Sequence, residues 1–229
     1  MTLHRFFVPA AEMEGERFAL PRSIERQVRT VLRLRDGDRV VLVPSDGTEV
    51  GCRLEGTDCV VEERRAVVTE PRHRLTIVQA LLKGDALEQV VQHGTEIGVD
   101  RFLLVVSERC VAREISERRL DRLRAIARES AEQSERGFVP AVEGPVLLME
   151  ALEAGSVLLY ERHDGTRLGA LQPPPSVIIG PEGGFTDGEV AAALAAGSIV
   201  AGLGPRILRS ETVAVAAAAV ILSGTGDFA

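Results

Sequence analysis

The stretches VIIGPEGGFTDGEV (residues 177–190) and IVAGLGPRILRSETVAVAAAAVIL (residues 199–222) decide how the second half of this chain folds. Each begins as a short apolar strand, stops at glycine and proline, and resumes as a helix. Apolar strands that alternate with helices predict a parallel sheet covered by helices, which is an α/β fold. Because ligands of such sheets bind beyond the carboxyl ends of the strands, the two loops predict a ligand cleft.

The same alternation begins near residue 74. Asp85 and Glu88 predict a capping box at the start of the first helix in this region, and Gly98 suits its C-terminal end. The expected strands are 75–82, 101–106, 156–161, 176–180 and 198–203, and the expected helices are 84–98, 116–134 and 211–222.

The first 70 residues have a different pattern, in which β-branched runs are separated by turn signals such as Asp46-Gly47. One helix, expected from Ser23 to Arg33, interrupts them. This pattern predicts a small β-barrel, with a domain break near TEPRHR (69–74). The expected strands are 4–8, 39–44, 48–56 and 59–68, and the expected domains are 1–70 and 71–229.

The composition limits the class of protein. The chain has 229 residues, of which 45% are hydrophobic and only 3% aromatic, so its core must consist of aliphatic side chains. A net charge of −7 excludes a nucleic-acid binder that is basic throughout, but not one with a local basic patch. Every basic residue except Lys83 is arginine, which is the better side chain for bidentate phosphate contacts.

Cysteines and histidines give no sign of a metal site or a disulfide framework. The three cysteines include no C-x-x-C pair, and the four histidines lack ligand spacing, so we expect no metal. The N-terminal residues lack the apolar segment of a signal peptide. The longest apolar run, Val213 to Leu222, is too short to span a bilayer. We therefore expect a cytoplasmic protein.

The two loops could be ordinary turns between strand and helix, or they could hold a ligand. Gly180, Gly183 and Gly184 would let the backbone approach a ligand closely. Thr186 and Glu189 predict a capping box for the next helix, and Ser210 is expected to cap the last helix. Neither loop matches a dinucleotide fingerprint or a P-loop. Because Glu182 would repel phosphate, an uncharged or cationic ligand fits better.

Together, IGPEGGFTDGEV and LGPRILRSETVAVAAAAVI closely resemble the paired loops of the SPOUT superfamily of RNA methyltransferases. Within it they resemble the RsmE family, which methylates N3 of a uridine in 16S ribosomal RNA. The resemblance covers nearly the whole chain. Further similar stretches are HRFFV (4–8), VLRLRDGD (31–38), KGDALEQVVQHGTEIGV (83–99) and ESAEQSERGFVPAVEGP (129–145). The chain departs from the family at Arg26-Gln27 and His93, where histidine and lysine are usual, and these departures bear on RNA contacts.

The resemblance implies a PUA-like, RNA-binding barrel over 1–70 and a SPOUT domain tied in a trefoil knot over 71–229. It also implies a homodimer that acts on 16S rRNA or the small ribosomal subunit and takes S-adenosylmethionine as cofactor. The cofactor-binding residues that it implies are Leu159, Tyr160, Ile179, Gly180, Pro181, Glu182, Gly183, Leu203, Gly204, Ile207 and Leu208.

Uracil N3 must lose a proton before it attacks a methyl group, so a base or a stabilising cation would help. The candidates are Arg209, Glu211 and, from the other subunit, Arg136. Alternatively, Arg209 is a surface arginine and Glu211 an acid that complements the helix dipole. The RNA-binding candidates are Arg5, Arg29, Arg33 and Arg35; a solvated turn is the alternative for the last two, which lie near Asp36 and Asp38.

Three other functions are rivals of this interpretation. A methyltransferase of this fold could act on a different RNA site. A non-catalytic RNA-binding protein of ribosome assembly could keep the fold without the reaction. A nucleotide-dependent dehydrogenase would need a fingerprint loop after the first strand of the second domain, and LLKGDALEQ is not one.

Overall fold

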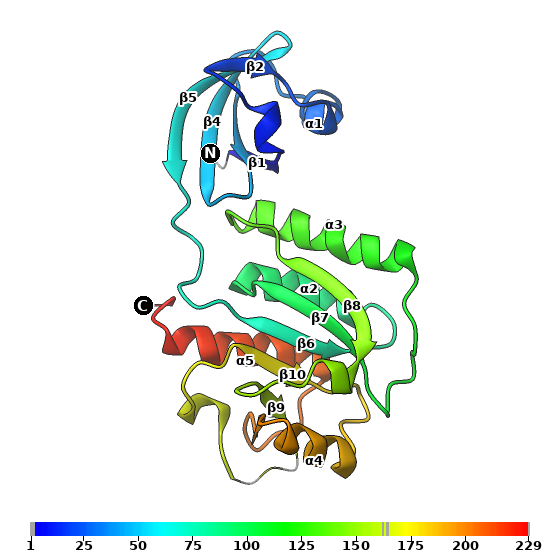
Figure 1. Ribbon diagram of the computed structural model, residues 1–229. Helices are drawn as coiled ribbons and strands as arrows, with labels where there is room; N and C mark the ends of the chain where they lie inside the picture. Colours follow the sequence, from blue (N-terminus) through cyan, green and yellow to red (C-terminus); the bar gives the residue numbers. More distant parts are fainter. Residues whose placement is uncertain (1–2, 162, 164, 229) are drawn as a thin grey trace. The chain divides into compact units, whose positions relative to one another are not determined.

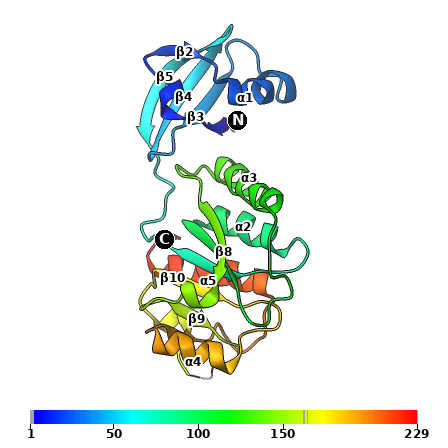
Figure 2. The ribbon, with the colours of Figure 1, turned by 45° about the vertical axis from the view of Figure 1, so that its right-hand side comes forward.

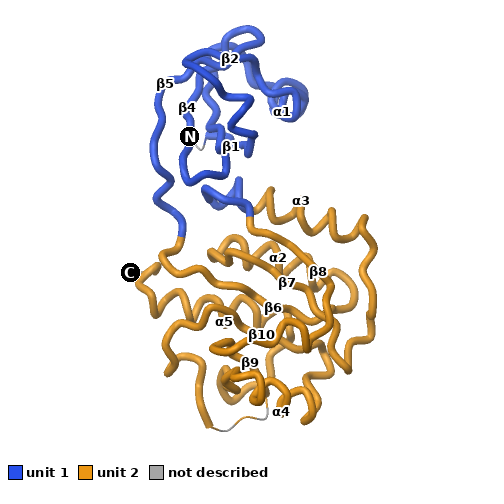
Figure 3. Tube along the Cα trace, viewed as in Figure 1, with its two compact units in different colours: residues 1–70, 131–139 blue, residues 71–130, 140–229 orange. Residues whose placement is uncertain are grey.

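The computed structural model describes residues 3–161, 163 and 165–228. The chain divides into two compact units, which are coloured separately in Figure 3. Unit 1 comprises residues 1–70 and 131–139, and unit 2 comprises residues 71–130 and 140–229. The change of unit after Glu70 lies within the TEPRHR segment.

Unit 1 is built on a five-stranded sheet with the order β1-β3-β4-β5-β2 (Figure 1). β1 pairs with β3 in parallel, and the other neighbours are antiparallel. Its core is mostly aliphatic, as the composition predicted, with Phe6 the largest fully buried side chain. The strands are β1 (His4–Phe7), β2 (Arg17–Ala19), β3 (Arg39–Val43), β4 (Thr48–Glu55) and β5 (Asp58–Ala66).

The helix expected over Ser23–Arg33 has a different form. The α-helix α1 covers only Arg22–Arg26, and a π-helical turn, Gln27–Val31, follows it. The wider turn is closed by a hydrogen bond from Leu32 N–H to the Gln27 carbonyl oxygen, at 2.9 Å. Arg33 then adopts a φ of 57°, which ends the helical path.

Unit 2 contains a six-stranded sheet with the order β11-β9-β10-β6-β7-β8 (Figures 1 and 2). Each neighbouring pair of strands in it is parallel, which confirms the predicted parallel α/β sheet. Its strands are β6 (Thr76–Ala80), β7 (Arg101–Val106), β8 (Ala141–Leu147), β9 (Val157–Leu159), β10 (Ser176–Ile179) and β11 (Ile199–Ala201).

The helices of unit 2 follow the predicted order. α2 packs against α5, and α4 packs against β11. α3 begins in unit 2, and its last residues belong to unit 1. The helices are α2 (Ala86–Ile97), α3 (Glu117–Gln133), α4 (Asp187–Ala195) and α5 (Ser210–Gly224). None of the helices in the described part of the chain is long and apolar enough to cross a membrane.

Two strands were not predicted from the sequence. β2 has only three residues. β8 contains Gly144 and Pro145, which read as turn residues, but Pro is tolerated in a strand at a sheet edge. Gly144 has a φ of 99°, and a Cβ there would lie 2.4 Å from the carbonyl oxygen of Leu104. Glycine is therefore required where β8 approaches β7.

The predicted capping box of α2 is wrong. Asp85 makes no side-chain cap hydrogen bond, whereas Gly98 ends the helix as predicted with a φ of 109°. The carboxylate of Glu88 instead lies 3.5 Å from Arg119 Nη2 and 3.8 Å from Arg122 Nε on α3. The carboxylate that the local motif assigned to the cap thus forms ion pairs with arginines of a neighbouring helix.

The packing of α2 on β7 predicts the outcome of a glycine substitution. A Cβ on Gly94 would lie 2.7 Å from two ring atoms of the fully buried Phe102. Alanine at position 94 would gain up to about 1 kcal/mol of helix propensity. Overpacking typically costs about 1–3 kcal/mol, so we expect Gly94→Ala to lower the midpoint of thermal unfolding.

The matched control is Gly188→Ala in α4, where a Cβ would lie 3.8 Å from its nearest neighbour atom, Thr186 Oγ1. Gly188→Ala should leave the midpoint unchanged or raise it. Equal midpoints for the two variants would contradict the close packing of α2 on β7.

Candidate active site

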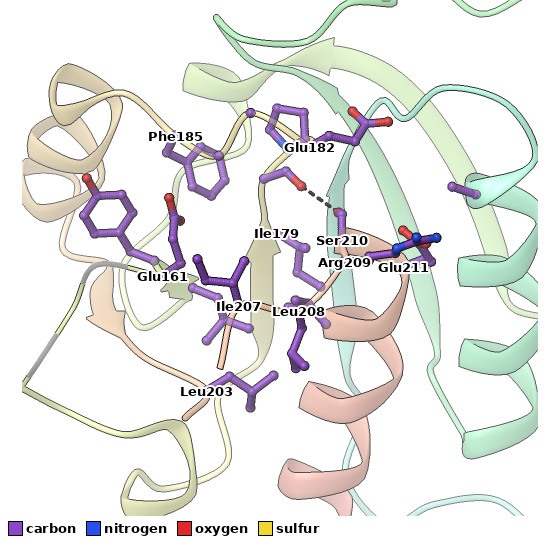
Figure 4. Close-up of a pocket in the computed structure, with 18 of the residues that line it drawn as sticks. Glu161, Ile179, Glu182, Phe185, Leu203, Ile207, Leu208, Arg209, Ser210 and Glu211 are labelled. Atoms are coloured by element: carbon purple, nitrogen blue, oxygen red, sulfur yellow. Dashed lines mark hydrogen bonds between the residues drawn. The ribbon is translucent and has the colours of Figure 1, made fainter. Parts of the chain in front are cut away.

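A cavity of about 720 Å³ opens within unit 2 beyond the carboxyl ends of the parallel strands (Figure 4). The segments that follow β6, β9, β10 and β11 all contribute to its lining. The sequence placed the ligand cleft at this edge of the sheet, and the cavity is where that prediction expected it. Its size is typical of sites for small molecules and cofactors.

The loop after β10 is a tight turn in which Gly184 takes a backbone conformation that glycine adopts most readily. Gly184 has a φ of 68°, and its N–H donates to the carbonyl oxygen of Pro181 at 2.9 Å. A Cβ on Gly184 would lie 2.9 Å from Oε1 of Glu161, which follows β9. The glycine thus lets the carboxylate of Glu161 approach the loop (Figure 4).

The capping box predicted at the start of α4 is confirmed. Thr186 Oγ1 accepts a hydrogen bond from Glu189 N–H, and Glu189 Oε2 accepts one from Thr186 N–H at 2.9 Å. The Glu189 carboxylate is buried, and its other oxygen accepts from Glu108 N–H at 2.7 Å. One carboxylate therefore joins the start of α4 to the segment after β7.

The segment after β7 supports the glycine loop from a second side. Arg109 Nη1 donates to the carbonyl oxygen of Gly183 at 3.0 Å, and Thr186 Oγ1 donates to Glu108 Oε2 at 3.1 Å. Sequence reasoning missed Glu108 and Arg109, because these contacts span more than 70 positions and leave no local pattern.

The loop after β11 leads directly into α5. Gly204 has a φ of 128°, and Ile207 is 85% exposed although it is aliphatic. Arg209 is the residue that precedes α5, and Ser210 is the first residue of the helix. This loop therefore brings two exposed side chains, the apolar Ile207 and the basic Arg209, to the cavity.

The prediction that Ser210 caps α5 is wrong. Its hydroxyl donates to the carbonyl oxygen of Gly180 at 2.7 Å (Figure 4). It accepts from Gln79 Nε2 at 2.9 Å. The hydroxyl therefore joins the start of α5 to the loop after β10 and to the end of β6. A serine that caps a helix accepts from a backbone N–H of the first turn, whereas the oxygen of Ser210 accepts from the amide of Gln79, a donor far away in the sequence.

The turn after β6 completes the lining. Glu182 Oε1 accepts from the backbone N–H of Lys83 at 2.9 Å, so this turn is tied to the glycine loop. Lys83 and Ala86 line the cavity, although sequence reasoning had assigned neither to the site. Three acids, Glu161, Glu182 and Glu211, and three basic residues, Lys83, Arg206 and Arg209, line the cavity, so its charges balance. Glu161 and Glu182 are both exposed there and can attract a positively charged group.

Thirteen of the predicted site residues meet at this cavity. They are the two catalytic candidates Arg209 and Glu211 and the eleven predicted cofactor-binding residues Leu159, Tyr160, Ile179, Gly180, Pro181, Glu182, Gly183, Leu203, Gly204, Ile207 and Leu208. The structure also brings in Gly184, which was expected to let the backbone approach a ligand, and residues that were not predicted for the site: Lys83, Ala86, Glu161, Phe185, Arg206, Ser210 and Val213.

Arg136 does not line this cavity and belongs to unit 1. Its side chain is only 3% exposed, and Nη2 lies 2.8 Å from Oε2 of Glu70. The same carboxylate accepts from Gly137 N–H at 2.7 Å. In its own chain Arg136 thus fixes segment 131–139 against the end of the first 70 residues.

The four predicted RNA-binding arginines lie in unit 1 and differ in accessibility. Arg5 is buried and paired with Glu49, and it donates to the carbonyl oxygen of Glu135. Arg29 is half-buried and donates to the carbonyl oxygens of Leu34 and Gly56.

Arg33 and Arg35 are exposed. The backbone N–H of Arg35 donates to Asp38 Oδ2 at 2.7 Å, so the acid beside them holds the turn. Of the four candidates, these two side chains are the most accessible to a phosphate backbone.

The environment of Glu49 explains why Arg5 is buried. Burial by itself raises the pKa of the Glu49 carboxyl, but hydrogen bonds from Arg65 and Arg5 outweigh it and hold the pKa below its ordinary value. Glu49 is therefore ionised at neutral pH. It holds Arg5 in an ion pair inside unit 1.

No cluster of three or more metal-ligating side chains was found among the described residues. The cavity instead offers backbone groups of two glycine loops and the aliphatic side chains of Leu159, Ile179 and Leu208. Such a lining suits a largely apolar ring system, and the carboxylates at the cavity suit a cationic group. These residues fit a nucleoside with a positively charged substituent, such as S-adenosylmethionine.

Comparisons with known proteins agree with this site. Residues 69–222 match the RNA methyltransferase domain family. A relative from Mycobacterium bovis, ribosomal RNA small subunit methyltransferase E, is 36% identical over 86% of this chain and 81% of its own. The protein of the same name from Bacillus subtilis is 29% identical over 96% of both chains.

Solved structures show the same fold. A ribosomal RNA small subunit methyltransferase E from Neisseria gonorrhoeae, bound to S-adenosyl methionine, is 30% identical and has a TM-score of 0.91 over 100% of both chains. A Legionella pneumophila methyltransferase in complex with the same cofactor is 27% identical, with a TM-score of 0.85 over 98% of both chains. On its sequence, its fold and its cavity, this chain belongs to the ribosomal RNA small subunit methyltransferase E family of RNA methyltransferases.

Proposed function

We propose that this protein transfers a methyl group from S-adenosylmethionine to N3 of a uridine in the 16S rRNA of the small ribosomal subunit. The observation that carries the proposal is the cavity between the two glycine loops, in a chain that shares its fold over its full length with a cofactor-bound relative. Because the substrate is ribosomal RNA, we place the reaction in the cytoplasm.

The cofactor would be held by the two loops. Backbone groups of Gly180 to Gly183 and of Leu203 and Gly204 line the cavity, together with the side chains of Ile207 and Leu208. Backbone groups on tight turns are rigid, so they bind without losing side-chain entropy. When bound, S-adenosylmethionine supplies an electrophilic methyl group, and the residues of this chain orient the nucleophile.

Arg209 and Glu211 would act on the uracil. They flank Ser210 at the start of α5, where both side chains line the cavity (Figure 4). A carboxylate at position 211 can accept the N3 proton, and a guanidinium at position 209 can stabilise the negative charge that develops on the uracil oxygens. Because N3 takes part in base pairing, the uridine must first be exposed or flipped out.

The finer architecture that we propose follows the family resemblance. Unit 1 would be a PUA-like barrel that binds RNA, and unit 2 would carry a trefoil knot around the cofactor cavity. A homodimer would complete the active site. Arg136, buried beside Glu70 in its own chain, would have to leave that pair in order to reach a partner's site, so we rank it below Arg209 and Glu211.

The deciding assay uses small ribosomal subunits that lack the modification, with labelled S-adenosylmethionine. We expect methyl transfer and a single 3-methyluridine, identified by mass spectrometry of the digested RNA. A different methylated nucleoside would assign the enzyme to another RNA site. Cofactor binding without transfer to any ribosomal RNA would point to another substrate, and absence of both would support a non-catalytic assembly protein.

Substitutions at the start of α5 test the chemistry. We expect Arg209→Ala and Glu211→Gln to lower kcat by roughly 10²- to 10³-fold, since each removes a group that acts in the transition state. The dissociation constant for S-adenosylmethionine, measured by calorimetry, should change much less. Arg209→Lys keeps the charge and is the matched control, with partial activity expected. Full activity of Arg209→Ala would remove this arginine from the mechanism.

Exposed arginines of unit 1 provide the test of RNA binding. The double variant Arg33→Ala, Arg35→Ala should weaken binding of 16S rRNA fragments. It should also reduce the steepness of log affinity against log salt concentration by about 1–2. The variant contacts fewer phosphates, so its binding releases fewer counterions. Arg101→Ala, at the start of β7, is the control and should leave the slope unchanged. An unchanged slope in the double variant would make 33–38 a plain solvated turn.

A further inference from the structure

A chain of hydrogen bonds, buried at Gln79 and partly buried at Gly180, crosses from the sheet of unit 2 to both loops of the cavity. It runs from Gln79 at the end of β6, through Ser210 at the start of α5, to Gly180 at the start of the loop after β10. We propose that Gln79 and Ser210 are positioning residues for methyl transfer, which set the separation of the two cofactor loops. This inference rests on the proposed function.

The direction of each hydrogen bond is fixed by the atoms that take part. The hydroxyl of Ser210 has one proton, which it donates to the Gly180 carbonyl oxygen at 2.7 Å, so towards Gln79 it must accept. Gln79 Nε2 donates to Ser210 Oγ at 2.9 Å and to the carbonyl oxygen of Ala80 at 3.0 Å. The carbonyl oxygen of Ala80 can only accept, which sets the orientation of the glutamine amide.

The middle and one end of this chain of hydrogen bonds lie at the cavity. Gly180 and Ser210 line the cavity, and Ser210 stands between Arg209 and Glu211. The three linked segments are 131 and 30 positions apart in the sequence, so no local structure holds them together. A shift at Ser210 would move the catalytic candidates relative to the loop that holds the cofactor, and misplacement of reacting groups is costly for catalysis.

Stability does not account for Gln79. Its side chain is fully buried in the central strand of the sheet, and within the described part of the chain its Oε1 has no hydrogen-bond partner. A buried acceptor without a partner destabilises the fold. Methionine, which has a similar shape and no polar group, would avoid that cost. Of the two bonds that the amide donates, the one to Ser210 reaches the cavity loops, and we assign the positioning role to that bond.

A second pair of buried serines serves as a comparison. Ser156 and Ser198, before β9 and β11, share a hydrogen bond of 2.7 Å, and Ser198 is 5% exposed. They lie at the amino ends of their strands, opposite to the cavity edge. Ser198→Ala therefore removes a buried hydroxyl of the same kind without touching the cofactor loops.

The experiment compares Gln79→Met, Ser210→Ala and Ser198→Ala with the wild type. For each protein we would measure the thermal unfolding midpoint, the S-adenosylmethionine dissociation constant by calorimetry, and kcat and KM on small subunits. We expect Gln79→Met to keep or raise the midpoint while weakening cofactor binding about 3- to 10-fold, the usual effect of one hydrogen bond. Ser210→Ala should weaken binding similarly and lower kcat, whereas Ser198→Ala should lower only the midpoint.

A double variant tests whether the two residues act in series. If Gln79 acts through Ser210, Gln79→Met with Ser210→Ala should bind the cofactor no more weakly than Ser210→Ala alone. Fully additive losses would contradict the series arrangement.

The inference would be overturned if both single variants bind the cofactor and turn over like the wild type. It would also be overturned if binding falls only in step with the unfolding midpoint, in Ser198→Ala as well. A wild type that binds no S-adenosylmethionine would instead refute the proposed function, so the two failures are distinguishable.

Discussion

The parallel register of the sheet in unit 2 is the constraint on which the site depends. Because β6, β9, β10 and β11 run in the same direction, their carboxyl ends meet at one edge. Residues from four separate parts of the chain therefore reach one cavity. An antiparallel strand among them would have sent its loop to the opposite edge.

The parallel sheet brings the loops to one edge, but it does not hold them in a fixed relation. That relation comes from three polar contacts with buried or backbone partners. Ser210 joins α5 to Gly180, Glu182 accepts from Lys83 N–H, and Glu189 joins α4 to Glu108. Each contact uses a side chain of one loop and a group of another, so the loops support one another.

Charge and burial separate the arginines of this chain into different roles. Arg5 and Arg136 are buried in ion pairs with Glu49 and Glu70, and removing either partner would leave an uncompensated charge inside unit 1. Arg33, in contrast, is exposed and free to meet a phosphate. A sequence motif cannot make this distinction, because the acid that pairs with a buried arginine comes from a part of the sequence far from that arginine.

The sequence by itself determined most of the helices and strands, the parallel sheet and the place of the cavity. These follow from local patterns: apolar strands, the glycines at positions 180–184, the Thr186 capping box and Gly98. It could not predict β8, the fate of the Glu88 carboxylate or the use of the Ser210 hydroxyl.

Only the tertiary structure decided those features, because each depends on a partner far away in the chain. Gly144 is needed because β8 approaches Leu104 closely. The carboxylate of Glu88 pairs with arginines of α3, and the hydroxyl of Ser210 donates to the carbonyl oxygen of Gly180. An oxygen such as that of Glu88 or Ser210 accepts either from its own helix end or from a distant donor, depending on the distance to each. That distance exists only once the sheet has formed.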